Sequence, residues 1–174
     1  MNAGTTATLA IGSNLGDREA ILRHCVAEID AIQSVSVLQA SKIVETAADR
    51  PEGVDRAAPR YLNAVVKIRL GLDPAALLRR LHEIENRMGR TREVRWGDRT
   101  LDIDIIQIDG MKLDTPELTV PHPRAHERAF VLAPWLDIEP SAVLAGRGAV
   151  GLLLARIGDL PADYAAEALW PTER

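Results

Sequence analysis

The stretch Tyr61-Leu-Asn-Ala-Val-Val-Lys-Ile-Arg-Leu70, followed by the helix start Asp73-Pro74, decides the expected fold. The first stretch is rich in apolar and β-branched residues and predicts a strand. Asp73 suits the N-cap of a helix and Pro74 its first turn. Four apolar residues then recur at helical spacing and a glycine closes the helix: Leu77, Leu81, Ile84, Met88 and Gly89.

The residues before this unit predict a strand, a helix and a second strand. Thr8–Ile11 is a short apolar run that Gly12 stops, and Asp17 is placed to cap the next helix. The apolar stripe expected for that helix is Ile21, Leu22, Cys25, Ile29 and Ile32. Val35 to Val44 predicts a strand, and the polar stretch 45–60 a long surface loop of the kind that often forms a lid.

The residues after it predict a fourth strand and further C-terminal structure. Leu101 to Ile108 alternates in polarity and is expected as a strand. The remaining expectations are a tight turn at Asp109-Gly110, a short returning strand at 111–113, a rigid loop at 120–124, an apolar segment at 129–138 and a helix at 150–157. The order strand, helix, strand, strand, helix, strand predicts one α+β domain over residues 1–174. Its core is ferredoxin-like (βαββαβ), with an antiparallel-rich sheet, helices packed on it and C-terminal additions.

Composition narrows the classes of function. The 174 residues carry a net charge of −4 and have a pI of about 5.6, whereas proteins that bind duplex nucleic acid usually carry a basic surplus. The one cysteine, Cys25, is expected in the core and fits a reducing compartment. The N-terminus has no signal-peptide pattern, and no apolar run is long enough to cross a membrane. These features predict a cytoplasmic protein with neither nucleic acid nor membrane as partner.

The segment Leu101-Asp-Ile-Asp-Ile-Ile106 is the sharpest chemical feature. Side chains alternate along a strand, so Asp102 and Asp104 share one face about 7 Å apart, while Leu101, Ile103 and Ile105 share the other. Two neighbouring carboxylates repel unless a cation or a proton intervenes. Oxygen ligands suit Mg²⁺, which commonly binds one or two carboxylates together with substrate phosphates. Either this metal site or a solvated strand face fits the spacing taken alone.

An arginine-rich loop leads into that strand. The loop spans 90–98, and the approach to the strand contains Trp96 and the arginines Arg87, Arg90, Arg92, Arg95 and Arg99. Arginine forks pair with phosphate in bidentate fashion, and a polyphosphate with bound Mg²⁺ requires both arginines and carboxylates. Two roles remain open for Glu85 on the preceding helix. It is either a surface partner of a loop arginine such as Arg92, or it orients an arginine that binds phosphate.

The loop Thr119-Val-Pro-His-Pro is stiff because each proline fixes φ and restricts its predecessor. His122 is therefore held in a definite direction, either as a structural residue or as a phosphate donor or general acid–base group. Phe130 is a core residue by default, although it could also stack on a flat ring. Tyr61 and Asn63 share a strand face and offer the aromatic surface and the amide that a planar heterocycle requires.

In this order, these segments resemble the 6-hydroxymethyl-7,8-dihydropterin pyrophosphokinase family of folate biosynthesis. The similarity runs from about residue 8 to residue 140. The matching segments are Ala10-Ile-Gly-Ser-Asn-Leu15, Tyr61-Leu-Asn-Ala-Val65, Gly89-Arg90, Arg95-Trp-Gly-Asp-Arg-Thr-Leu-Asp-Ile-Asp104 and Val120-Pro-His-Pro-Arg-Ala-His-Glu-Arg-Ala-Phe130.

The resemblance implies transfer of pyrophosphate from ATP to the hydroxymethyl oxygen of the pterin, with release of AMP. It implies that two Mg²⁺ ions are bound by Asp102 and Asp104. The residues it places at the triphosphate are Arg90, Arg92, Arg99, His122 and Arg128. It places Trp96 and Glu85 in the nucleotide site, with Thr119 and Ile105 beside adenine. The residues it places at the pterin are Tyr61, Asn63, Phe130 and Thr46. ATP and a small pterin are then the expected partners, with no obligate protein partner.

Two departures from the family pattern leave other functions open. The family commonly has a Pro-Pro-Leu-Gly-like run after the threonine, whereas Thr46 is followed by Ala47-Ala-Asp-Arg50. Asp98 replaces the usual proline of the Trp-Gly-Pro-Arg run and adds a carboxylate. A different acceptor, or a catalytically weak protein that binds nucleotide or pterin, is therefore an alternative. A Mg²⁺-dependent nuclease is another, which the acidic pI disfavours.

Overall fold

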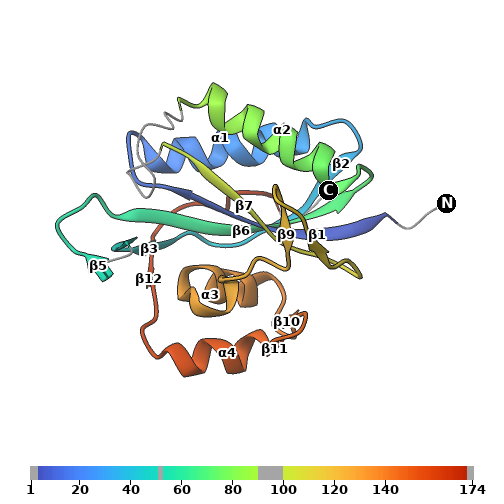
Figure 1. Ribbon diagram of the computed structural model, residues 1–174. Helices are drawn as coiled ribbons and strands as arrows, with labels where there is room; N and C mark the ends of the chain where they lie inside the picture. Colours follow the sequence, from blue (N-terminus) through green and yellow to red (C-terminus); the bar gives the residue numbers. More distant parts are fainter. Residues whose placement is uncertain (1–3, 51–52, 90–99, 172–174) are drawn as a thin grey trace.

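The computed structural model describes residues 4–50, 53–89 and 100–171, and it is organised around one antiparallel sheet (Figure 1). The strand order is β12-β3-β6-β1-β7, and β2 also pairs with β6. These strands are β1 (Thr5–Ser13), β2 (Val35–Ala40), β3 (Val44–Thr46), β6 (Tyr61–Leu70), β7 (Asp102–Ile108) and β12 (Ala162–Asp163). Without β12, the order is that of a ferredoxin-like sheet, as the sequence predicted.

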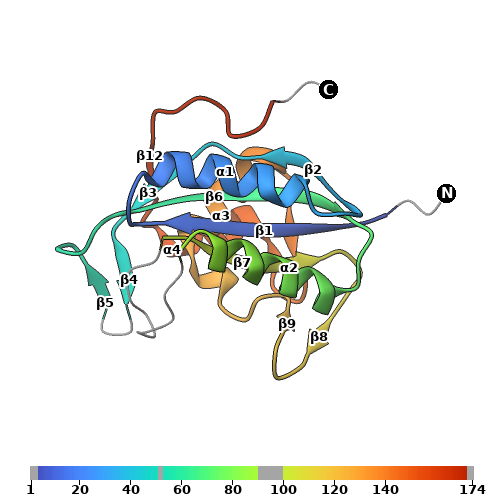
Figure 2. The same ribbon diagram turned by 90° about the horizontal axis from the view of Figure 1, so that it is seen from above.

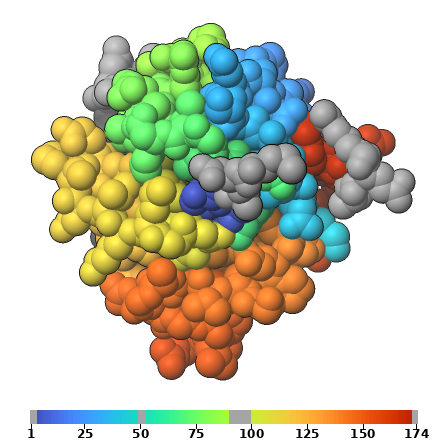
Figure 3. All heavy atoms as spheres, turned by 90° about the vertical axis from the view of Figure 1, so that its right-hand side faces the viewer, coloured from blue at the N-terminus to red at the C-terminus, as the bar shows by residue number. Residues whose placement is uncertain are grey.

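Two helical layers enclose the sheet. Helices α1 (Arg18–Asp30) and α2 (Pro74–Arg87) cover one face, and α3 (Ala129–Ile138) and α4 (Val150–Ile157) lie on the other (Figures 1 and 3). The caps expected from the sequence are confirmed, since Asp17 accepts from the Ala20 amide at 3.1 Å and Asp73 from the Ala76 amide at 3.0 Å.

Alternation along the strands divides the core between these two layers. Leu9, Leu62 and Ile103 pack with the α1 and α2 side chains, including the buried Cys25. Val65 and Ile106 pack under α3 and α4 with Trp135. Each central strand therefore buries apolar residues on both faces, which explains its near-continuous hydrophobic sequence.

Several sequence predictions require correction. β1 does not stop at Gly12 but continues to Ser13. Val35–Val44 is not one strand, because β2 ends at Ala40 and β3 begins at Val44. The stretch 45–60 contains a hairpin of β4 (Ala48–Arg50) and β5 (Gly53–Asp55), which extends beyond the end of the sheet (Figure 2).

The short elements after β7 also differ from the prediction. The segment after the Asp109-Gly110 turn does not pair back onto β7; instead β8 (Leu113–Asp114) pairs with β9 (Thr119–Val120). The loop after β9 contains a cis Val120–Pro121 bond and leads through η1 (Ala125–Glu127) into α3. A small hairpin of β10 (Val143–Leu144) and β11 (Gly148–Ala149) then precedes the predicted helix α4.

The C-terminal segment returns from α4 to the opposite side of the sheet. β12 pairs with β3, with Ala162 opposite Glu45. Further on, Leu169 is buried in the core under α1, and Arg23 donates to the carbonyl oxygens of Glu167 at 2.7 Å and Ala168 at 2.8 Å. Within the described ranges, no helix has both the length and the apolar character required to cross a bilayer.

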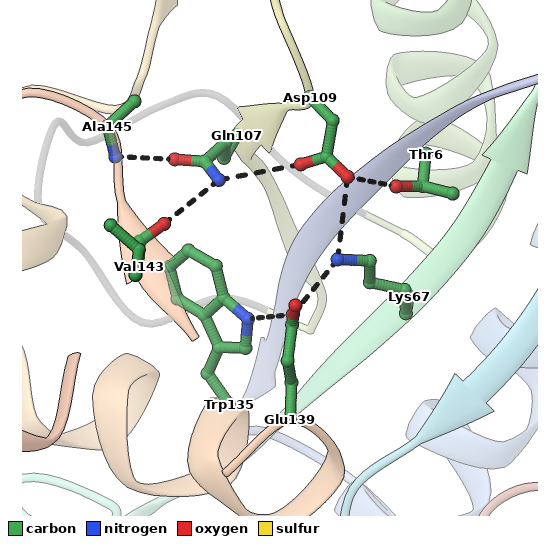
Figure 4. A network of polar contacts seen from close by, with 8 residues as sticks. All are labelled: Thr6, Lys67, Gln107, Asp109, Trp135, Glu139, Val143 and Ala145. Atoms are coloured by element: carbon green, nitrogen blue, oxygen red, sulfur yellow. Dashed lines mark hydrogen bonds and ion pairs between the residues drawn. The ribbon is translucent and has the colours of Figure 1, made fainter. Parts of the chain in front are cut away.

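A polar cluster, here called the Lys67 network, ties the sheet to the C-terminal end of α3 (Figure 4). Lys67 Nζ lies 2.9 Å from Glu139 Oε2 and 3.7 Å from Asp109 Oδ2, and Trp135 donates to the same Glu139 oxygen at 2.9 Å. Thr6 donates to Asp109. The remaining members extend the network to the β10–β11 hairpin: Gln107, Val143 and Ala145.

Candidate functional site

Three central strands bring the predicted site residues to one end of the sheet. Gly12, near the end of β1, lies opposite Asn63 of β6 on one side and opposite Asp102 of β7 on the other. Residues directly opposite in a ladder project from the same face. Asn63, Gly12 and Asp102 therefore form a row on the face that α3 partly covers.

Gly12 makes this row possible because it has no side chain. A Cβ built at Gly12 would lie 2.8 Å from Asn63 Oδ1 and 3.7 Å from Tyr61 Cδ1. The Asn63 amide thus occupies the space above the middle strand. From its own neighbourhood in the sequence, Gly12 was expected to stop the strand. A glycine within a strand often marks such a close approach, and that signal was present.

The two carboxylates of β7 face a histidine and an arginine from distant segments. Arg128 Nη1 donates to Asp104 Oδ2 at 3.2 Å, and His122 Nε2 lies 3.8 Å from the same oxygen. Arg128 directly precedes α3, and His122 follows β9. We call Asp102, Asp104, His122 and Arg128 the Asp104 cluster.

His122 is fixed by its backbone and electrostatically tuned by its surroundings. Its amide donates to the Ile106 carbonyl of β7 at 2.8 Å, which ties the loop to the edge of the sheet. Burial, reinforced by the positive charge of Arg128, lowers the pKa of His122 to about 4, although Asp102 opposes this shift. At neutral pH the imidazole is therefore uncharged.

Among the described residues, two buried side-chain nitrogen atoms have no hydrogen-bond partner: Arg128 Nε, within this cluster, and His126 Nδ1, in η1. Unpaired buried polar groups are costly and uncommon in folded proteins. An unpaired, buried donor on the Arg128 guanidinium suits an anionic ligand, such as a phosphate, better than it suits a purely structural ion pair.

Three of the four residues predicted to bind the heterocycle lie together, namely Thr46, Tyr61 and Asn63. Asn63, which is 6% exposed, donates from Nδ2 to Thr46 Oγ1 at 3.0 Å, and Thr46 is opposite Tyr61 in the β3–β6 ladder. Phe130 is partly buried against the α3 core, and the Arg128 guanidinium lies 5.7 Å from its ring centroid. Phe130 is thus both a packing residue and a neighbour of the Asp104 cluster.

Three predicted residues have other surroundings. Glu85 is only 1% exposed and accepts from the Ile103 amide at 2.8 Å, so it does not lie on the surface. A pairing with Arg92 stays a prediction, because Arg92 lies outside the described ranges. Ile105 is 3% exposed and packs in the core on the α1 and α2 face. Thr119 donates to Asp114 at 3.4 Å. Whether Ile105 and Thr119 contact adenine stays a prediction. Four other predicted residues lie outside the described ranges: Arg90, Arg92, Trp96 and Arg99.

The donor set fits a hard divalent cation that is completed by substrate. Asp102 and Asp104 could supply oxygen ligands, and the Asp104 side chain is 34% exposed. Within the described part of the chain, no group of three or more His, Cys, Asp or Glu side chains is arranged to hold a metal ion. Mg²⁺ characteristically binds one or two carboxylates, retains waters and takes further ligands from phosphates, so the pair is sufficient.

Comparison with known proteins identifies the family. Residues 8–140 match the family described as 7,8-dihydro-6-hydroxymethylpterin-pyrophosphokinase (HPPK). The chain belongs to this family. As an HPPK it is an ATP-dependent diphosphotransferase, and the reaction of the family is a step of folate biosynthesis. This confirms the function class predicted from the sequence.

Curated relatives in several bacteria carry the name 2-amino-4-hydroxy-6-hydroxymethyldihydropteridine pyrophosphokinase. The Bacillus subtilis protein is 47% identical over 132 residues, which cover 76% of this chain and 77% of that protein. The Mycobacterium tuberculosis protein is 38% identical over 170 residues, covering 91% of this chain and 86% of that protein.

Solved structures confirm the fold at lower identity. One similar chain is an HPPK-DHPS crystallised with substrates, with a TM-score of 0.65 and 15% identity over 88% of this chain. A Plasmodium falciparum HPPK-DHPS matches with a TM-score of 0.63 and 16% identity over 90% of this chain. This HPPK spans less than half the length of those two chains, at 43% and 46%.

Proposed function

We propose that this HPPK transfers the terminal pyrophosphoryl group of ATP to the hydroxymethyl oxygen of 6-hydroxymethyl-7,8-dihydropterin at the row formed by Asn63, Gly12 and Asp102. The row is the observation that supports the proposal most strongly. Two strand spacings separate the Asn63 and Asp102 backbones by about 10 Å. A ring edge held at Asn63 then lies next to phosphates held at Asp102.

The pterin end of the site combines hydrogen bonding with flat apolar surface. The Asn63 amide supplies a donor and an acceptor, oriented by its bond to Thr46. Tyr61 and Phe130 supply the aromatic surfaces, which suit stacking on a planar ring. A pterin ring has a polar edge and two flat faces, and the four residues Asn63, Thr46, Tyr61 and Phe130 match these features.

The phosphate end combines carboxylates with cationic and neutral donors. Asp102 and Asp104 would hold two Mg²⁺ ions, which neutralise charge on the transferring group and the leaving group when bound. Arg128 donates charge-assisted hydrogen bonds, and the uncharged His122 donates from Nε2. We assign Arg90, Arg92 and Arg99 to the same triphosphate.

The remaining nucleotide contacts are assigned by similarity to the family. Thr119 and Ile105 take the adenine side, and Trp96 lines the site. The buried Glu85 carboxylate lies behind β7, where its bond to the Ile103 amide fixes the strand between the two aspartates. Glu85 would thereby hold the carboxylate pair in register as well as orient an arginine.

The reaction is an in-line displacement that positioning and charge neutralisation drive. The hydroxymethyl oxygen forms a bond to the β-phosphorus, and the bond from that phosphorus to the α,β-bridging oxygen breaks. AMP leaves with the electron pair, and the hydroxyl proton is released as the new bond forms. We further propose that the enzyme works in the cytoplasm without an obligate protein partner, nucleic acid or membrane.

The decisive experiment measures nucleotide products from ATP and Mg²⁺ with and without 6-hydroxymethyl-7,8-dihydropterin. Formation of AMP and the pterin diphosphate, dependent on the pterin and without ADP, is the expected result. Tight ATP binding without AMP would contradict the proposal and favour a different acceptor or a binding protein. Omission of Mg²⁺ should abolish AMP formation, which tests the assignment of the metal.

A further inference from the structure

A charged cluster lies on the reverse face of the strands that carry the pterin residues. Arg18 Nη1 is 2.9 Å from Glu45 Oε1 and 2.8 Å from the Arg60 carbonyl oxygen. Arg60 Nε lies 3.3 Å from the other Glu45 oxygen. We call Arg18, Glu45 and Arg60 the Arg18 clamp.

The clamp holds the two residues that directly precede pterin contacts. Glu45 comes immediately before Thr46 in β3, and Arg60 immediately before Tyr61 at the start of β6. Thr46 and Tyr61 are opposite each other in the ladder. Because strand side chains alternate, Glu45 projects toward α1 while Thr46 projects toward the pterin site. The clamp thus fixes the site from behind.

Arg18 is itself held by a rigid element. It is the first residue of α1, whose N-terminus is capped by Asp17 and whose buried Leu22 and Cys25 pack on the sheet. The chain leaves the sheet for the β4–β5 hairpin after Glu45 and returns to it at Arg60. Both of these attachment points accept a hydrogen bond from the same nitrogen, Nη1 of Arg18. Asn14 adds a 3.2 Å bond to the Pro59 carbonyl at the second attachment point.

We propose that Arg18 and Glu45 are positioning residues for the pterin: the clamp fixes the spacing of Thr46, Tyr61 and Asn63 by joining the two ends of the β4–β5 hairpin to α1. This inference rests on the proposed function for the identity of the ligand. The Arg18 and Glu45 side chains are only 27% and 24% exposed, so the ion pair is partly shielded from solvent. It therefore contributes more to stability than an exposed surface pair does.

The helix offers a matched control. Arg23, one and a half turns further along α1, also bonds two main-chain carbonyl oxygens and one glutamate, Glu19. Its contacts hold the C-terminal segment at Glu167 and Ala168 and include neither attachment point of the β4–β5 hairpin. We compare Arg18→Gln with Arg23→Gln by titrating the fluorescence of 6-hydroxymethylpterin with a non-hydrolysable ATP analogue and Mg²⁺ present.

Arg18→Gln is expected to weaken pterin binding about tenfold with little change in the KM for ATP, because a hydrogen bond to a charged group is lost at each hairpin end. Arg23→Gln should bind pterin like the parent. Arg18→Lys should recover part of the loss, and Glu45→Gln should reproduce most of it. Equal pterin affinity in Arg18→Gln and Arg23→Gln would overturn the inference.

A second readout does not depend on any ligand. Arg56 lies exposed in the segment between β5 and Tyr61, so trypsin cleavage after Arg56 reports how firmly the hairpin is attached. Faster cleavage there in Arg18→Gln than in Arg23→Gln is expected, and equal rates would refute the clamp. If Arg18→Gln is cleaved faster but the parent protein does not bind pterin, the proposed function is wrong. The conclusion that the clamp attaches the hairpin to α1 would still hold.

Discussion

Two charged clusters lie on the same face of the sheet but differ in how fully their polar groups are paired. The Lys67 network joins one ammonium, two carboxylates and an indole N–H, and both the ammonium and the indole N–H have a carboxylate partner (Figure 4). The Asp104 cluster instead places two carboxylates on alternate residues and includes a guanidinium whose Nε has no partner among the described residues. In a structural cluster the polar atoms are hydrogen-bonded to one another, whereas a binding cluster leaves some of them unpaired for a ligand.

Removal of a carboxylate from the Asp104 cluster is the strongest test of the difference between the two clusters. Asp102→Ala or Asp104→Ala should abolish turnover, lowering kcat by about 1,000-fold, because the charge of the transferring group is no longer neutralised. AMP formation measures this, with circular dichroism to show that the fold is retained. Normal activity in either variant would refute the metal assignment.

Removing the guanidinium should have the next largest effect. Arg128→Met retains much of the side-chain volume but loses the charge and the donors, so we expect kcat to fall about 100-fold. Arg128→Lys should recover only part, because an ammonium lacks the bidentate fork. A kcat close to that of the parent protein in Arg128→Met would show that this residue only holds Asp104 in place.

Filling the space at Gly12 tests the pterin end of the same site. Gly12→Ala places a methyl group 2.8 Å from the present Asn63 Oδ1, so the amide must move. We expect pterin affinity to fall about tenfold, as for other overpacked sites, with the KM for ATP less affected. Binding titrations of each ligand distinguish these effects. An unchanged pterin affinity would mean that Asn63 shifts without loss of a ligand contact.

The smallest effect on catalysis is expected in the Lys67 network. Lys67→Met leaves Asp109 and Glu139 without their cation and should lower the free energy of unfolding by about 1–3 kcal/mol, with kcat unchanged. Lys42→Met is the control, since Lys42 is 81% exposed and its ion pair with Asp137 should contribute little. Thermal unfolding and AMP formation measure the two quantities. A large loss of kcat in Lys67→Met would remove the distinction between the clusters.

Regular elements were predictable because their signals are local. The bounds expected for β6 agree with the structure at both ends, and α2 begins at the predicted Pro74. Strands β4 and β5 were missed because three residues are too few to show alternation. The pairing of β8 with β9 was missed because register depends on contacts between segments, which single-sequence patterns do not specify.

The site was predictable in part for the same reason. The carboxylate pair follows from strand alternation alone. The contact of Arg128 with Asp104 depends on how the loop after β9 returns to β7, which no spacing in the sequence indicates. The burial of Glu85 could not be predicted, because it adjoins the apolar face of α2, where a charged residue is ordinarily exposed. Its bond to an edge-strand amide explains why it is buried instead.

The pairing of β12 with β3 has a consequence for how the enzyme matures. β3 carries Thr46, and its outer hydrogen-bonding edge is covered by Ala162 and Asp163 from late in the chain. A chain that ends before residue 162 would leave that edge unpaired beside the active site, and an open strand edge readily pairs with another polypeptide. A ribosome that stops before the codon for residue 162 would therefore release an aggregation-prone protein rather than a slightly shorter enzyme.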